Sequence, residues 1–219
     1  MNTRTLTVTG KGHVEMAPNQ VILSFSLSAE GYAYQGTVEA LNLKVEKLRV
    51  AAEGFGVDRS RLKTSNFSIM PKYQYHERTR EREFRGFTAS HDLRLEIPFN
   101  RETLNRAINA IAESGSDAKF NIRFAVAETE ELKKRTLQAA VADATVKAQI
   151  IAEAASVRLG GIVRFDYGSI EVRFFEPDFD VSPMACKAPS TPEADIEPEE
   201  VSSSVSVTFV WEIGDLPSV

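Results

Sequence analysis

The chain has little of what marks a disulfide-stabilised, membrane-spanning or nucleic-acid-binding protein. Its 219 residues include a single cysteine, Cys186, which excludes an internal disulfide. No apolar run approaches the ~18 residues needed to cross a bilayer, so we expect no transmembrane segment. The net charge of −5 is small and gives no general reason to bind nucleic acid. With 42% hydrophobic and 26% charged residues, the composition is typical of a soluble globular protein.

Catalytic and cofactor-binding motifs are also missing. Gly10-Lys11-Gly12 lacks the third glycine of a dinucleotide fingerprint and the Gly-Lys-Ser/Thr ending of a phosphate loop, so we interpret it as a turn or bulge. There is no Gly-x-Ser-x-Gly elbow, and Cys186 stands in a proline-rich stretch without a nearby histidine. The acidic residues form no recognisable acid–base pair. We therefore predict no catalytic residue, no metal site and no cofactor.

Three histidines are the remaining candidates for chemistry. No two of His13, His76 and His91 have the i, i+4 spacing of a helical metal site. His13 follows the glycine turn and His76 lies in a charged segment, so we interpret both as solvated. His91 lies on the apolar face of a predicted strand. There, a hydrogen-bonded structural histidine is the favoured interpretation, and a ligand or acid–base group is the alternative.

The order of the periodic segments predicts an α+β fold. Between Val21 and Val126 the order is strand, helix, strand, strand, helix, strand. This is the split βαβ order of ferredoxin-like folds, in which helices cover one face of an antiparallel sheet. Two long strands, 61–75 and 86–99, are joined by a tip at 77–83 in which glutamates alternate with arginines and cancel much of their field. We interpret this tip as a solvated projection or a subunit contact and predict no nucleic-acid partner.

An alanine-rich segment, 129–159, is predicted to form one long helix that Gly160-Gly161 can end. At ~1.5 Å per residue such a helix would measure roughly 45 Å. Ala140 and Ala152 widen its apolar face, and small residues allow a close approach to whatever the helix covers. The predicted face follows steps of three and four: Leu137, Val141, Ala144, Ala148, Ile151, Ala155 and Leu159.

Three further strands complete the predicted domain. The first, 5–9, is ended by the glycine turn, and two C-terminal strands are expected near 162–167 and at 201–212. Residues 176–200 hold five of the nine prolines together with several acids, so we expect a loop or disordered arm there. No domain boundary is evident, and we predict one domain, 1–219, with this arm inserted.

Several short motifs, in their order and spacing, resemble the SIMPL domain family, named after a signalling molecule associated with a pelle-like kinase. The resemblance covers roughly residues 5–167 and resumes in the last strand. Asn19 stands where relatives usually have Asp, a change compatible with the same turn. The matching motifs are Val8-Thr9-Gly10-Lys11-Gly12, Ala17-Pro18-Asn19, LKTSNFSIMPKY at 62–73, Gly86-Phe87-Thr88-Ala89-Ser90 and AAVADATVKA at 139–148.

The resemblance implies a role without chemistry. Bacterial members are mostly exported to the periplasm or cell surface, one forms a large ring-like or channel-like oligomer, and some are linked to oxidative-stress tolerance. Eukaryotic members act in kinase signalling, and the family has no established catalytic residues to carry over. We therefore predict a non-catalytic, oligomeric binding or scaffold protein that associates with itself and with a protein partner. The alternative is a small-ligand sensor or enzyme using His91.

The expected location depends on where the natural chain begins. If Met1 is the native start, the absence of an apolar leader predicts a cytoplasmic protein. If a signal peptide has been removed, the resemblance implies the periplasm or the cell surface.

Overall fold

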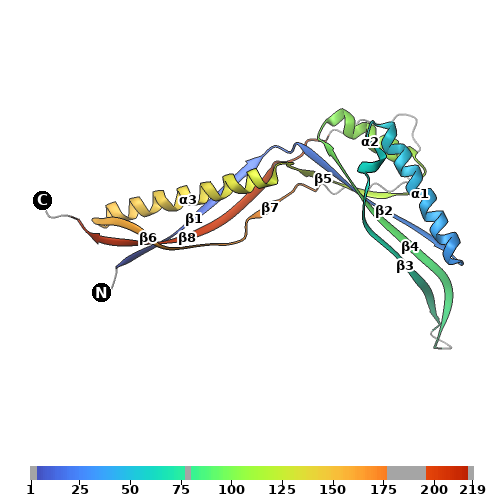
Figure 1. The fold of residues 1–219 in the computed structure, drawn as a ribbon, viewed down its shortest axis with the longest axis horizontal. Helices are drawn as coiled ribbons and strands as arrows, with labels where there is room; N and C mark the ends of the chain where they lie inside the picture. The colour runs from blue at the N-terminus through green and yellow to red at the C-terminus, as the bar shows by residue number, and fades with distance from the viewer. Residues whose placement is uncertain (1–3, 77–79, 177–195, 217–219) are drawn as a thin grey trace. The chain divides into compact units, whose positions relative to one another are not determined.

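The computed structural model describes residues 4–76, 80–176 and 196–216. These residues form helices and two four-stranded antiparallel sheets, so the α+β prediction is confirmed. The contacts divide the chain into two compact units, each with its own sheet (Figure 1). Unit 1 comprises Met1–Pro18, Val126–Phe175 and Glu199–Val219, and unit 2 comprises Asn19–Ala125 and Glu176–Pro198.

Unit 2 has the ferredoxin-like order predicted from the sequence. Its elements are β2 (Gln20–Gly31), α1 (Tyr34–Gly54), the 3-10 helix η1 (Arg59–Arg61), β3 (Lys63–His76), β4 (Glu81–Pro98), α2 (Arg101–Glu113) and β5 (Lys119–Ala125). The strands pair in the order β3-β4-β2-β5, and every pairing is antiparallel. This sheet order is the one that the split βαβ arrangement requires, so the prediction for residues 21–126 is confirmed.

Alternation along β2 from Leu23 onward separates the two faces of this sheet. Leu23, Phe25 and Leu27 are buried, whereas the intervening Ser24 and Ser26 are exposed. At the start of the strand Val21 and Ile22 are both buried. Helix α1 packs on β2, β4 and α2. Its buried residues follow the three-four spacing of an amphipathic helix: Thr37, Leu41, Val45, Leu48 and Ala52. One face of the sheet therefore forms the core, and the other carries polar side chains.

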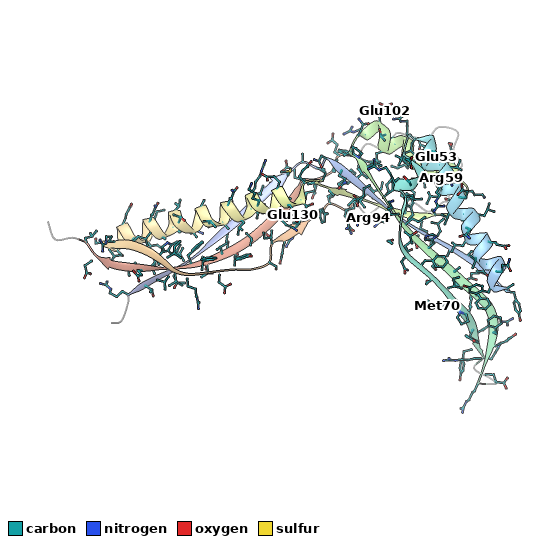
Figure 2. The ribbon with its side chains drawn as sticks, in the orientation of Figure 1. Glu53, Arg59, Met70, Arg94, Glu102 and Glu130 are labelled. Atoms are coloured by element: carbon teal, nitrogen blue, oxygen red, sulfur yellow. The ribbon has the colours of Figure 1, made fainter. Side chains whose placement is uncertain are left out.

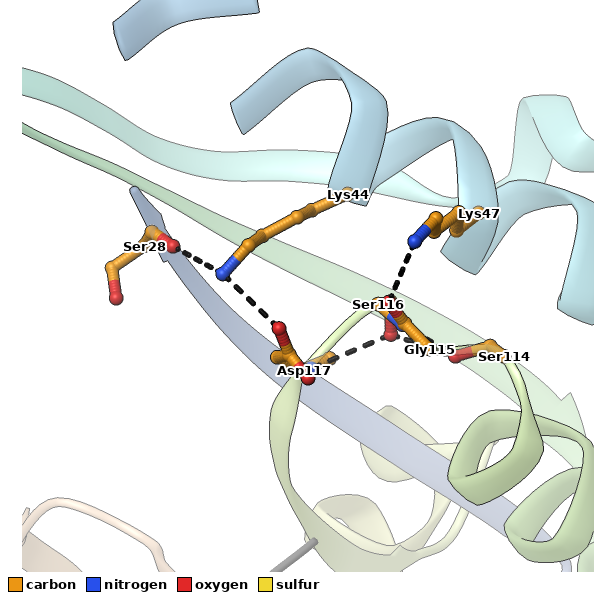
Figure 3. A network of polar contacts seen from close by, with 8 residues as sticks. Ser28, Lys44, Lys47, Ser114, Gly115, Ser116 and Asp117 are labelled. Atoms are coloured by element: carbon orange, nitrogen blue, oxygen red, sulfur yellow. Dashed lines mark hydrogen bonds and ion pairs between the residues drawn. The ribbon is translucent and has the colours of Figure 1, made fainter. Parts of the chain in front are cut away.

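Two lysines of α1 fix the loop that leads into β5 (Figure 3). Lys44 Nζ donates a hydrogen bond to the Ser28 carbonyl at 3.0 Å and lies 3.4 Å from Asp117 Oδ2. Lys47 Nζ donates to the Gly115 carbonyl at 3.1 Å. Gly115 adopts a positive φ of 61°, which glycine reaches without strain. These contacts hold the start of β5, and with it Lys119, at the edge of the sheet.

Unit 1 is a sheet covered by one helix. Its elements are β1 (Thr5–Met16), α3 (Thr129–Ala154), β6 (Val157–Tyr167), β7 (Glu171–Arg173) and β8 (Val201–Asp215). Strand β8 lies between β1 and β6, and β7 also pairs with β8. Alternate residues of β8 face the helix and form the core of the unit: Val205, Val207, Phe209 and Trp211.

The prediction that Gly10-Lys11-Gly12 is a turn is wrong. Strand β1 continues through both glycines to Met16, and both glycines are buried against α3. A Cβ on Gly10 would overlap the Ala140 carbonyl oxygen, and one on Gly12 would overlap the Thr136 carbonyl oxygen. Glycine is needed here because the helix backbone lies directly on the strand.

The predicted long helix exists, but its end and its buried face differ from the prediction. Helix α3 ends at Ala154, because Ser156 turns the chain with a φ of 56° and β6 begins at Val157. The buried line runs in steps of four: Leu132, Thr136, Ala140, Ala144, Ala148 and Ala152. Val141 and Ile151, predicted to be buried, are 38% and 43% exposed. Gly160 and Gly161 lie inside β6, beside its register shifts.

Most of the predicted arm, residues 177–195, lies outside the described residues. Its two ends are described and contact basic residues of unit 2. Glu176 forms an ion pair with Arg123, and Glu197 Oε1 lies 3.3 Å from Arg101 Nη2. None of the helices in the described part of the chain is long and apolar enough to span a membrane. The prediction of a single domain stays a prediction.

Candidate interaction surfaces

His91 lies on β4, on the side of the sheet that packs against the helices, and is 9% exposed. Its Nε2 is 2.8 Å from Thr64 Oγ1, and its ring meets that of Phe67 edge-on at 5.3 Å. Nδ1 has no hydrogen-bond partner among the described residues. Burial, and then the positive charge of Arg49, lower the pKa of His91, while Asp92 opposes the shift. The imidazole is therefore neutral at pH 7.

The other two histidines are more exposed and lie beside carboxylates. His13 Nε2 is 3.1 Å from Glu15 Oε1 on β1, and His76 Nε2 is 2.8 Å from Glu83 Oε2 across the β3–β4 hairpin. Both positions fit the solvated interpretation. Within the described ranges, no three His, Cys, Asp or Glu side chains are grouped so that they could hold a metal ion. Cys186 lies outside those ranges.

Unit 1 exposes large apolar side chains on α3 and β6. Register places Ile162 opposite Trp211 and Phe165 opposite Phe209, so both β6 side chains lie on the sheet face that α3 covers. They are nevertheless 56% and 63% exposed, because α3 lies mainly over β1. We define the α3–β6 surface as Val141, Ile162, Phe165 and Tyr167, which are 38% to 63% exposed. Contiguous exposed apolar patches on soluble proteins commonly mark interaction sites.

The two edge strands of the same sheet, β1 and β6, differ in whether their outer backbone groups are covered. On the β1 edge, Asp143 of α3 accepts a 2.7 Å hydrogen bond from the Lys11 backbone N–H and another from Lys147 Nζ. Helix α3 thus occupies a donor that a new strand would use. Strand β6 pairs on one side only, with β8, in the described sheet. Edge strands of this kind are templates for pairing with another chain.

Unit 2 carries an exposed aromatic cluster at the far end of its β3–β4 hairpin. Successive rings meet at centroid distances of 5.3 to 5.8 Å and angles of 68° to 89°: Tyr32–Phe84, Tyr73–Phe84, Phe84–Phe87 and Tyr34–Phe87. Such edge-to-face contacts are favourable. Tyr32 is 75% exposed, and Tyr34 and Tyr73 are more than half exposed. This cluster was not predicted, because the alternating charges at 77–83 were the feature considered there, although Tyr32, Tyr34, Phe84 and Phe87 recur at two- and three-residue spacings.

Comparison with known proteins identifies the family. The model of the SIMPL family, described as a protein of unknown function (DUF541), matches residues 6–211. The chain belongs to the SIMPL family. The chain is 27% identical over 217 residues to the 26 kDa periplasmic immunogenic protein of Brucella melitensis, covering 95% of this chain and 84% of the relative. The Brucella abortus protein of the same name gives the same identity and coverage. An uncharacterized protein, YggE, of Edwardsiella ictaluri is 21% identical over 181 residues, which are 83% of this chain and 73% of that protein.

The structure explains why two of the SIMPL-like motifs occur together. The glycines of the first motif, Gly10 and Gly12, lie against Ala140 and Ala144 of the motif at 139–148. Another motif contains Gly86, whose φ is 111° and whose Cβ position is blocked by the Gly31 carbonyl. In this SIMPL protein these motif glycines are therefore packing positions, and they need no bound ligand to account for them.

Proposed function

We propose that this SIMPL protein is a non-catalytic binding or scaffold protein that associates with itself, and that the α3–β6 surface is where two copies meet. The observation that carries the proposal is the exposure of Ile162 and Phe165 on an edge strand, beside a helix that leaves them uncovered. Burying this apolar area would contribute roughly 25 cal/mol per Å².

A symmetric arrangement suits this surface. Two β6 edges related by a two-fold axis would pair antiparallel, and each Phe165 would then be covered by the partner copy. The β1 edge is less suited, because Asp143 already accepts the Lys11 N–H. Specific interfaces bury ~800 Å² on each partner, so an interface would extend beyond these side chains along α3.

The relatives support a location but not a stress role. Two of them are named periplasmic proteins, and this favours the periplasm for the present chain. The cytoplasmic alternative and the link to oxidative-stress tolerance stay predictions.

Sedimentation at several concentrations tests self-association. We expect the mass of the wild type to rise with concentration, because apolar burial at β6 drives pairing. Phe165→Asp should shift this rise to at least tenfold higher concentration, since it would bury an unpaired charge at the interface. The matched control is Leu43→Asp, which changes a side chain of α1 that is 61% exposed and should leave the mass unchanged. A wild type that stays monomeric throughout would contradict the proposal.

One observation favours a second candidate, a small-ligand sensor or an enzyme using His91. The buried Nδ1 of His91 has no hydrogen-bond partner in the described part of the chain, and buried ring nitrogens normally have one. A ligand whose binding survived His91→Ala would remove this candidate.

A further inference from the structure

The polar face of the unit 2 sheet is arranged as rows of side chains that cross all four strands. Strand register defines the rows, because residues directly opposite one another point to the same side. One row is Lys119, Ser26, Asp92 and Asn66, and the next is Asn121, Ser24, Arg94 and Lys63. The helices of the unit pack on the opposite, apolar face.

The serines of β2 form the floor of a hollow between longer side chains. A cavity of about 340 Å³ is lined by five residues of these rows and by four neighbours: Ser24, Ser26, Asp92, Lys119 and Asn121, with Phe25, Ser65, Leu93 and Phe120. A second cavity, of about 290 Å³, is lined by Arg61, Lys63, Arg94 and Glu96. Arg61 ends η1, Lys63 begins β3, and Arg94 lies on β4 and is one of the residues labelled in Figure 2. The two cavities share no lining residue, but Ser24 of the first lies directly opposite Arg94 of the second, so they are neighbours on this face, and we call them together the serine groove.

Positive charge gathers at one end of the groove. Lys63 and Arg94 are directly opposite each other on neighbouring strands, and like charges in that position destabilise a sheet. Arg94 Nη2 lies 2.8 Å from Glu96 Oε1, and Arg61 donates at 2.9 Å to the Glu96 backbone carbonyl. The lining of this cavity therefore contains three cationic side chains and one carboxylate, so it is locally positive although the whole chain has a net charge of −5.

The other nearby acids are held by their own donors. Asp92 accepts hydrogen bonds from Ser26 Oγ at 2.7 Å and from Asn66 Nδ2 at 3.2 Å. Asp58 accepts a hydrogen bond from the Ser60 backbone N–H at 2.7 Å. The pKa of Asp58 is lowered first by a side-chain hydrogen bond with Ser60, then by this backbone bond, and also by the charges of Arg59 and Lys63. Neither carboxylate forms an ion pair with Lys63 or Arg94 in the described structure.

A carboxylate of this chain already lies against the same face. Arg123 follows Lys119 and Asn121 along β5 on the polar side of the sheet and forms an ion pair with Glu176. The arginine is therefore oriented to bind an acidic side chain that comes from outside the sheet. This contact shows what kind of group the polar face accepts.

We propose that the serine groove binds an extended acidic segment of a partner protein. One carboxylate binds Lys63 and Arg94, a second binds Lys119, and the hydroxyls of Ser24 and Ser26 hydrogen-bond to the peptide between them. Three strand spacings separate β3 from β5, or roughly 14 Å, which an extended chain spans in about four residues. The preferred ligand therefore has two acidic residues about four positions apart. The site is independent of the α3–β6 surface.

Calorimetric titration of the full chain with two peptides tests this site. The probe is Ac-Ser-Glu-Ser-Gly-Ser-Glu-Ser-NH2, and the control peptide carries glutamine in place of both glutamates. We expect the acidic peptide to bind and the control peptide to bind at least tenfold more weakly. Binding should weaken with added salt, because exposed charges are screened beyond ~10 Å at 0.1 M ionic strength.

Paired variants show whether the groove is responsible. Lys63→Gln with Arg94→Gln should weaken binding of the acidic peptide about tenfold. Lys134→Gln with Arg135→Gln removes the same charge from α3 of unit 1 and should change binding less than twofold. Equal loss in both variants, or equal binding of both peptides, would overturn the proposal. Tighter binding of an oligonucleotide of the same charge would also overturn it. Phe165→Asp should bind the peptide like the wild type, so failure of self-association does not imply failure here.

Discussion

In both units a helix packs on an antiparallel sheet, but the side chains between helix and sheet are large in unit 2 and small in unit 1. In unit 2 the buried face of α1 carries Leu41, Val45 and Leu48, which meet large apolar residues of the sheet. In unit 1 the buried face of α3 carries alanines, and β1 presents Gly10 and Gly12 to them. The first interface gains stability from buried apolar area, and the second depends on close approach of two backbones.

This difference explains where each unit keeps its large apolar side chains. An alanine face leaves no room for bulky residues between helix and strand, so Val141, Ile150 and Ile151 remain exposed on α3. Unit 2 buries Leu41, Val45 and Leu48 of α1 in its core, although Leu43 and Val50 of the same helix are exposed. In unit 1 the exposed apolar residues of α3 are joined by Ile162 and Phe165 on an edge strand, which is the combination that an interface needs.

Removing bulk should damage unit 2 most. Leu48→Ala deletes a side chain that is 1% exposed, and we expect a loss of about 3 kcal/mol in the free energy of unfolding, from lost burial and the cavity left behind. Urea unfolding followed by amide exchange in β2 and β4 measures this. Trp211 is the only tryptophan of the chain and lies in the core of unit 1, so its fluorescence reports the other unit separately.

The two probes also test the prediction of one domain. Coincident transitions for Trp211 and the β2 amides would support a single cooperative domain. Loss of stability confined to the unit 2 amides would indicate units that unfold separately. A Leu48→Ala midpoint equal to that of the wild type would contradict the packing described for α1.

Adding bulk should damage unit 1. Gly10→Ala places a methyl group against the Ala140 carbonyl oxygen, and we expect a loss of about 2 kcal/mol as α3 is pushed from β1. The urea midpoint from Trp211 fluorescence measures the effect. Gly161→Ala is the matched control, because nothing lies within 4 Å of its Cβ position. If both variants behaved alike, close approach would not be what requires Gly10.

The elements and buried faces of unit 2 could be predicted from the sequence more completely than those of unit 1, for a physical reason. Between Val21 and Val126 the alternation of strands and the three-four spacing of helices reflect burial of large side chains, and both patterns are visible locally. In α3 the buried face is selected by glycines more than 120 residues earlier in the chain. Because Val141 and Ile151 are strongly hydrophobic, the local sequence pattern predicted a buried face next to the one that is buried in the structure.

The candidate sites depended even more on long-range pairing. The α3–β6 surface could not be predicted because Val141 was expected to be buried, and residues 157–159 were expected to be helical. The serine groove requires the register that sets Lys63 opposite Arg94 and Ser26 beside Lys119. Alternating serines in β2 indicated a polar face, but the partners across that face follow only from the sheet order.

Acid should separate the two units by the pH at which each loses stability. Burial and Arg49 lower the pKa of His91 in folded unit 2 below its ordinary 6.5, so the unfolded chain takes up a proton first. The contribution of neutral His91 to the stability of unit 2 is therefore complete above about pH 6.5. This contribution is lost as the pH falls from 6.5 towards the pKa of His91 in the folded chain. In unit 1 the hydrogen bonds from Lys147 and Lys11 lower the pKa of Asp143 below its ordinary 3.8. That contribution is present above pH 3.8 and is lost only as the pH falls further.

Urea midpoints between pH 7.5 and 4.5, followed by both probes, measure this difference. The unit 2 midpoint should fall over this range, by a smaller amount than in the two core substitutions, while the Trp211 midpoint should respond less. His91→Gln keeps a polar side chain but cannot take up the proton, so it should flatten the unit 2 profile, and His13→Gln serves as the exposed control. An unchanged slope in His91→Gln would mean that other groups cause the acid sensitivity and that the pKa of His91 does not differ between the folded and the unfolded chain. Unit 2 is expected to lose stability at a higher pH than unit 1, because its buried imidazole titrates nearer neutrality than the Asp143 carboxylate, which joins helix to strand at the surface of unit 1.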